Sequence, residues 1–230
     1  MNYLKKSGIS AEHKAYKSIK YIKTVPDSLQ QETKYPVLLF LHGAGSRGDD
    51  ISKVETNPFF EAMGSRDDVS FIIIAPQCGA DTWFDIFQEL KELVLAEAND
   101  PLADASRIYA IGASMGGYGV WQIAMSMPEI FAAIVPICGG GMYWNASRLK
   151  NIGVWAFHGR DDSCVLCRES EKMVDAVNAC GGEAKLTVYE NCFHDSWNGA
   201  YAEPDLFNWM LAHKNKGYTE TSRLSGHCFG

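Results

Sequence analysis

A serine flanked by two glycines is the feature of this sequence most suggestive of chemistry. Residues 112–116 read Gly-Ala-Ser-Met-Gly, a G-x-S-x-G pattern with Ser114 at its centre. The apolar run 108–111 precedes the pattern, and residues 118–127 follow it with apolar side chains at helical spacing. A strand, a sharp turn at a serine and then a helix is the context in which such a serine acts as a nucleophile. A glycine-rich turn with an incidental serine is the alternative until partner residues are found.

The two glycines have a physical role in this interpretation. Strand and helix approach closely on either side of a strained turn, so Gly112 and Gly116 must lack side chains. Ser114 would then stand at the N-terminus of the following helix. The partial positive charge of that helix end favours a developing oxyanion.

A histidine and a pair of aspartates follow two later predicted strands. His194 follows the alternating segment 185–189 in a polar loop. Histidine, the side chain that most readily takes and returns a proton near neutral pH, suits a base that takes the serine proton. Asp161 and Asp162 follow the apolar run 154–157, where a carboxylate can orient a histidine. From their positions alone either aspartate fits, and one of them could be a surface residue or a helix N-cap.

Other candidate site residues come from a glycine-rich loop and two tryptophans. The loop 42–45 follows the apolar run 37–41, and its small side chains would let a backbone N–H approach a substrate oxygen. The N–H of Met115, next after the serine, would be the other donor of such an oxyanion hole. Trp83 and Trp197 are candidates for the wall of a substrate pocket, although aromatic residues more often pack in a core.

The elements that must position these residues alternate between strand and helix. Such alternation predicts an α/β fold: a doubly wound, mostly parallel sheet with helices on both faces, which places ligands at the carboxyl ends of its strands. The first strand is expected to be antiparallel. The expected strands are 17–25, 37–41, 71–75, 108–111, 133–137, 154–157 and 185–189, and the expected helices are 51–63, 83–98, 118–127, 167–180 and 204–213.

Length and loop sizes predict one domain. Residues 1–213 are expected to form the catalytic domain, and the polar residues 214–230 a loosely held extension. The segment 139–153 between two predicted strands is long enough for a loop or a short helix. It is too short for a cap domain over the site.

Composition limits the classes of partner. With 47% apolar and 21% charged residues the chain resembles ordinary globular proteins, and its net charge of −7 argues against nucleic acid and anionic membranes as partners. The seven cysteines and the lack of a secretory signal pattern favour reduced thiols and a cytoplasmic location. Cys164 and Cys167 lack the second ligand pair of a zinc site, so no metal or cofactor is expected. Nothing indicates the oligomeric state.

The order Ser114, Asp162, His194 is the chain order of the α/β-hydrolase triad. The sequence resembles the small carboxylesterase branch of that superfamily, with its phospholipase/carboxylesterase-type, dienelactone-hydrolase-like and feruloyl-esterase-like members. The resemblance implies that Asp162 is the acid, because it lies four residues after the histidine of H-G-x-x-D, and that the N–H groups of Ala44 and Met115 form the oxyanion hole. The stretches that carry it are LLFLHGAGSRGDD, IIIAPQC, RIYAIGASMGGYGVW, VWAFHGRDDS and CFHDSW. A Val-Pro pair usual after the acid is replaced here by CVLC.

The expected function is therefore hydrolysis of carboxylic esters with short or polar acyl groups, on a small-molecule or carbohydrate-linked substrate, through an acyl-enzyme. A peptidase of the prolyl-oligopeptidase type is the first alternative. That family normally carries a large N-terminal propeller, whereas the first central strand here begins at residue 37. A hydrolase-like binding protein without activity is the second alternative, but such proteins usually lose a member of the triad.

Overall fold

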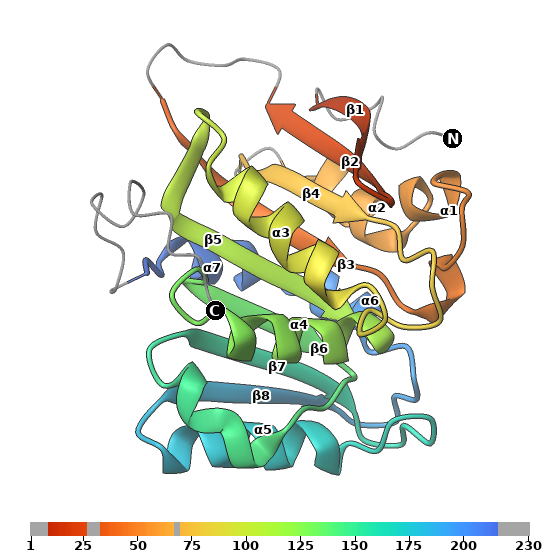
Figure 1. The fold of residues 1–230 in the computed structure, drawn as a ribbon. Helices are drawn as coiled ribbons and strands as arrows, with labels where there is room; N and C mark the ends of the chain where they lie inside the picture. The colour runs from red at the N-terminus through yellow and green to blue at the C-terminus, as the bar shows by residue number, and fades with distance from the viewer. Residues whose placement is uncertain (1–8, 27–32, 67–69, 216–230) are drawn as a thin grey trace.

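One eight-stranded sheet organises the molecule. The computed structural model describes residues 9–26, 33–66 and 70–215 of the 230-residue chain. Figure 1 shows helices packed on both faces of this sheet. In spatial order its strands are β1 (Ile9–Tyr16), β2 (Ile19–Pro26), β4 (Ile72–Pro76), β3 (Tyr35–Leu41), β5 (Ala103–Ala113), β6 (Ala133–Ile137), β7 (Gly153–Gly159) and β8 (Glu183–Tyr189).

The sheet is parallel except at one edge. From β4 through β8 neighbouring strands pair in parallel, whereas β1 pairs with β2, and β2 with β4, in antiparallel register. Every residue of β3 is buried, which explains the unbroken apolar run of the central strands. The expected doubly wound architecture with an early antiparallel strand is confirmed.

Two hydrophobic cores lie on opposite faces of the sheet (Figure 1). The first core is covered by α3 (Phe87–Ala98), α4 (Met115–Ser126), α5 (Arg168–Ala179) and the 3₁₀ helix η3 (Tyr143–Leu149). The second is covered by α1 (Ser52–Glu55), α2 (Pro58–Gly64), α6 (Trp197–Ala202) and α7 (Leu206–Leu211). Helices on both faces leave the carboxyl edge of the parallel strands as the place for a site.

Several elements differ from the sequence-based expectation. Strand β1 is not among the expected strands, and half of its residues are polar. The expected helix 51–63 is two short helices, since Asn57 caps a new helix whose first residue is Pro58. Helix α3 begins at Phe87 rather than at residue 83, and α6 is not among the expected helices.

No cap domain is inserted between β6 and β7. The connecting segment 138–152, all of it described, contains η3 and otherwise irregular backbone. The expected C-terminal extension lies outside the described residues except for residues 214 and 215, and there the N–H of Asn215 still donates to Ser106 of the domain. None of the helices in the described ranges has the length and apolar character needed to cross a bilayer.

Candidate active site

Ser114 occupies a strained turn between β5 and α4. Its backbone has φ 57° and ψ −119°, a conformation rare for a residue with a side chain. The turn is held from both sides: the Ser114 N–H donates to Ile137 on β6 at 2.9 Å, and the Ser114 carbonyl accepts from the N–H of Tyr118 at 3.1 Å. The turn therefore presents the serine side chain at the N-cap of α4.

The neighbouring glycines are required by close contacts with β3. A Cβ added to Gly116 would lie 1.9 Å from the carbonyl oxygen of Leu41, and one added to Gly112 would lie 2.6 Å from the same oxygen. Both distances are far below van der Waals contact, and the neighbour is backbone. The steric reason for the G-x-S-x-G pattern is thus present in this fold.

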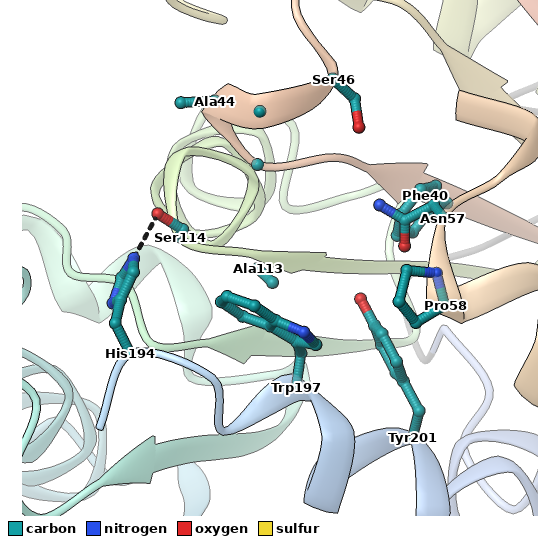
Figure 2. Close-up of a pocket in the computed structure, with 12 residues that line it drawn as sticks. Phe40, Ala44, Ser46, Asn57, Pro58, Ala113, Ser114, His194, Trp197 and Tyr201 are labelled. Atoms are coloured by element: carbon teal, nitrogen blue, oxygen red, sulfur yellow. Dashed lines mark hydrogen bonds between the residues drawn. The ribbon is translucent and has the colours of Figure 1, made fainter. Parts of the chain in front are cut away.

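Three side chains from three strand ends form a hydrogen-bonded chain. His194 Nε2 lies 2.8 Å from Ser114 Oγ, a contact drawn in Figure 2, and His194 Nδ1 lies 2.7 Å from Asp162 Oδ2. Because a carboxylate can only accept here, Nδ1 carries the proton and Nε2 is free to accept from the serine hydroxyl. The serine is thereby hydrogen-bonded to a base that a buried carboxylate orients.

Asp162, and not Asp161, is the buried carboxylate. Its other oxygen accepts from the N–H groups of Cys164 and Val165, both at 2.9 Å. Burial acts to raise the pKa of Asp162, but the bonds from His194 and these two amides outweigh it and hold the pKa below its ordinary value. Asp161 is exposed, so the structure brings only Asp162 to the histidine.

A fully buried histidine, His158, fixes the loop that carries Asp162. His158, at the end of β7, donates from Nε2 to the carbonyl of Val165 at 2.8 Å, and its Nδ1 lies 2.8 Å from the hydroxyl of Ser170. Burial lowers the pKa of His158, so the ring stays neutral beside Asp162. The segment CVLC therefore leaves the acid in place despite its departure from the Val-Pro pattern.

The loop after β3 is held by His42. Its Nδ1 donates to the carbonyl of Gly43 at 2.7 Å, and its Nε2 accepts from the N–H of Cys78 at 3.0 Å. In a trans peptide the carbonyl of Gly43 and the N–H of Ala44 point in opposite directions. His42 thus fixes the direction of the Ala44 N–H. Among the backbone hydrogen bonds that the turns, loops and helix caps of the described residues make, none has the N–H of Ala44 or of Met115 as its donor.

The burial of His42 should make the free energy of unfolding depend on pH. Burial lowers its pKa from 6.5 to about 4, so the folded state resists a proton that the unfolded chain accepts. The stabilisation is complete above the unfolded pKa and is lost as pH falls through the folded one. Between about pH 7 and about pH 4.5, the titration of His42 should lower the unfolding free energy of the wild type by about 2 kcal/mol. The His42→Gln variant lacks this group, so its unfolding free energy, measured by urea denaturation, should fall by about 2 kcal/mol less over the same range. An unchanged loss in the variant would contradict this.

A pocket of about 370 Å³ opens beside Ser114 (Figure 2). Trp197 lines it as expected, with its ring 5.8 Å from that of His194 in an edge-on arrangement. The expectation for Trp83 was wrong: the side chain is fully buried and does not line this pocket. Its indole N–H donates to the carbonyl of His42 at 3.1 Å. Trp83 therefore supports the glycine loop from within the core, a depth that sequence spacing does not reveal.

A cysteine lies close to Asp162 and His194. Cys138 Sγ, one carboxylate oxygen of Asp162 and one ring nitrogen of His194 lie within 4.8 Å of one another. In the described residues this is the one group of three potential metal-binding side chains that lie so close together. Burial raises the pKa of Cys138 to about 12, which keeps the thiol neutral and a poor metal ligand. Asp162 and His194 are also hydrogen-bonded to each other. These three side chains are therefore better suited to proton transfer than to metal binding. Cys164 and Cys167 are free thiols.

Solved structures share this arrangement of elements. A thermostable esterase superposes with a TM-score of 0.74 at 29% identity, over 91% of this chain and 64% of its own. The chain has the α/β-hydrolase fold. A ferulic acid esterase matches this chain with a TM-score of 0.67 at 17% identity, over 86% of this chain and 96% of its own.

The same α/β-hydrolase fold also occurs in peptidases. An acylaminoacyl peptidase of Pyrococcus horikoshii superposes with a TM-score of 0.68 at 17% identity, over 93% of this chain and 43% of its own. This chain therefore spans about two thirds of the esterase and less than half of the peptidase. No protein-family model matches the sequence, and no curated protein sequence resembles it significantly.

Proposed function

We propose that this chain is a serine hydrolase that cleaves carboxylic esters with short or polar acyl groups through an acyl-enzyme intermediate. The observation that carries the proposal is the chain of hydrogen bonds from Asp162 through His194 to Ser114, at the mouth of a pocket. A serine hydroxyl is a weak nucleophile alone. A neutral histidine at 2.8 Å supplies the base it needs.

The reaction follows from the position of the protons. His194 Nε2 takes the hydroxyl proton while Ser114 Oγ bonds to the ester carbonyl carbon, and the imidazolium is stabilised by Asp162. The negative charge that develops on the carbonyl oxygen would be met by the N–H groups of Ala44 and Met115. His194 then gives its proton to the leaving alkoxide. Water, activated by the same histidine, releases the acid and restores the serine.

The charge of the pocket favours esters over peptides. Apart from His194 and Tyr201, whose hydroxyl keeps its proton, its described lining residues carry no ionisable side chain, so no charged group there would pair with the charged terminus of a peptide. The fold also occurs in acylaminoacyl peptidases, which keeps N-acylated peptides as the second candidate substrate. A neutral acyl group followed by either an ester or an amide would fit the same walls.

The exposed aromatic residues of η3 support a carbohydrate-linked or aromatic leaving group. Tyr143 and Trp144 are 55% and 72% exposed, in the loop that leaves the carboxyl end of β6 next to β5. Flat aromatic surfaces at the edge of a site are suited to stacking on rings. We therefore retain a small-molecule or carbohydrate-linked ester as the substrate.

The missing cap predicts a limit on acyl length. Each methylene that stays in water forgoes about 0.8 kcal/mol of transfer free energy, and a pocket of about 370 Å³ cannot enclose a long chain. We expect p-nitrophenyl butyrate to have a kcat/KM about tenfold or more above that of the palmitate, because a four-carbon acyl group fits the pocket whereas a sixteen-carbon chain overfills it. Steady-state assays on purified protein measure this.

The same assays separate the candidate functions. Turnover of an N-acetyl-peptide amide with no ester turnover would replace the esterase by a peptidase. An equal or higher kcat/KM on palmitate would show an acyl tunnel that the described residues do not contain.

A further inference from the structure

The pocket beside Ser114 has an apolar body. Phe40 of β3, Ala113 of β5, Pro58 of α2 and Trp197 of α6 supply its walls, and the glycine loop closes one side. Figure 2 shows Trp197 between His194 and Tyr201, so the pocket leads from the serine past the indole to the tyrosine. An apolar group attached to the serine would be desolvated along this path.

The far end of the pocket is polar. Tyr201 is 6% exposed, and in the described part of the chain its hydroxyl has no hydrogen-bond partner. Figure 2 shows this hydroxyl pointing toward Pro58, beside Asn57. Burial raises the pKa of Tyr201, so the hydroxyl keeps its proton and can donate. The hydroxyl is not among the fully enclosed polar atoms that lack a partner in the described residues, so it reaches the open space of the pocket. A ligand oxygen placed there would accept its hydrogen bond.

Asn57 adds further donors at the same end. Its Oδ1 accepts from the N–H of Phe59 at 3.1 Å to cap α2, which identifies the other side-chain atom as the amide nitrogen. No hydrogen bond from that nitrogen is formed within the described residues, and Asn57 lines the pocket. Two side chains therefore offer unused N–H and O–H groups to whatever fills the pocket.

The direction of the pocket determines which half of an ester it takes. The leaving oxygen must come within hydrogen-bond distance of His194 Nε2 to receive its proton. The pocket runs from Ser114 away from His194 (Figure 2). It is therefore positioned for the acyl group, the part of the ester that stays attached to the carbonyl carbon.

We propose that this pocket selects acyl groups with an apolar body and a neutral oxygen at the far end, bound by the Tyr201 hydroxyl and the Asn57 amide. The oxygen is neutral because the far end carries no ionisable group except the protonated tyrosine. This selectivity rests on the proposed ester hydrolysis, and Asn57 and Tyr201 are its specificity-determining residues.

The test compares two esters of nearly equal size. We expect kcat/KM for methyl 3-(4-hydroxyphenyl)propanoate to exceed that for methyl 3-(4-methylphenyl)propanoate by about tenfold, as for two hydrogen bonds made to a neutral group. Tyr201→Phe keeps the ring that packs against Phe59, and Asn57→Ser keeps an oxygen for the helix cap. Each should reduce the ratio to about threefold or less.

A matched control removes a tyrosine hydroxyl elsewhere. Tyr16→Phe lies on the edge strand β1, outside the pocket, and should keep the wild-type ratio. A ratio near one in the wild type, or a ratio unchanged in both pocket variants, would overturn the proposal.

Binding to an inactive variant separates this selectivity from the reaction itself. In a Ser114→Ala background, the dissociation constants of the two intact esters, measured by quenching of tryptophan fluorescence, should differ by about tenfold, and Tyr201→Phe should reduce the difference. If the wild type cleaves no ester but this difference is found, the proposed function fails and the pocket assignment stands. Equal dissociation constants overturn the assignment even if esters are cleaved.

Discussion

Ser114→Ala should reduce kcat for p-nitrophenyl butyrate by roughly 10³–10⁶-fold, because serine, histidine and aspartate act as a unit. The substitution removes Oγ, the atom that hydrogen-bonds to His194. Alanine keeps the Cβ, so the strain at φ 57° is neither added nor relieved. We therefore expect a folded protein with a thermal midpoint close to that of the wild type.

The comparison should include a serine outside the site. Ser147→Ala in η3 removes an exposed hydroxyl and should leave kcat within about twofold of wild type. Retention of a tenth of the activity by Ser114→Ala would rule out Ser114 as the nucleophile.

Asp162→Asn should reduce kcat by about 10⁴-fold through the histidine tautomer. The oxygen that faces the N–H groups of Cys164 and Val165 must remain an oxygen, because an NH₂ group there would oppose two donors. The NH₂ group is thereby directed at His194 Nδ1, which must then accept. The ring proton moves to Nε2, and Nε2 can no longer take the proton of Ser114.

Asp161→Asn is the matched control, since it removes the same charge one residue away. Asp161 is exposed, and its side chain makes no contact with the histidine. Its kcat should stay within about threefold of wild type. A severe loss in Asp161→Asn together with a mild one in Asp162→Asn would show that the aspartates have been assigned in the wrong order.

The central residues of the site could be predicted because each follows a strand. Ser114, Asp162 and His194 lie within a few residues after the ends of β5, β7 and β8, and parallel strands bring their carboxyl ends to one edge of the sheet. The glycines at 112 and 116 could be predicted for a similar reason, since the contact with the Leu41 carbonyl is required by the turn itself.

The pocket could not be predicted in the same way. Tyr201 belongs to α6, a six-residue helix that contains a glycine and is too short for a helical period to be visible. Asn57 is marked by its sequence only as a helix cap before a proline. Nothing local indicates that the two meet. Trp83 was misplaced for the converse reason: burial depends on α3 and α4 packing over it, and spacing along the chain carries no information on depth.

Labelling with a fluorophosphonate tests the central claim most directly, because such a probe bonds only to an activated serine. After incubation of the folded protein, mass spectrometry should find one adduct per chain, on the peptide that contains Ser114. Denatured protein and the Ser114→Ala variant should stay unlabelled. An adduct on another residue, or none on protein that hydrolyses p-nitrophenyl butyrate, would contradict the assignment of Ser114 as the nucleophile.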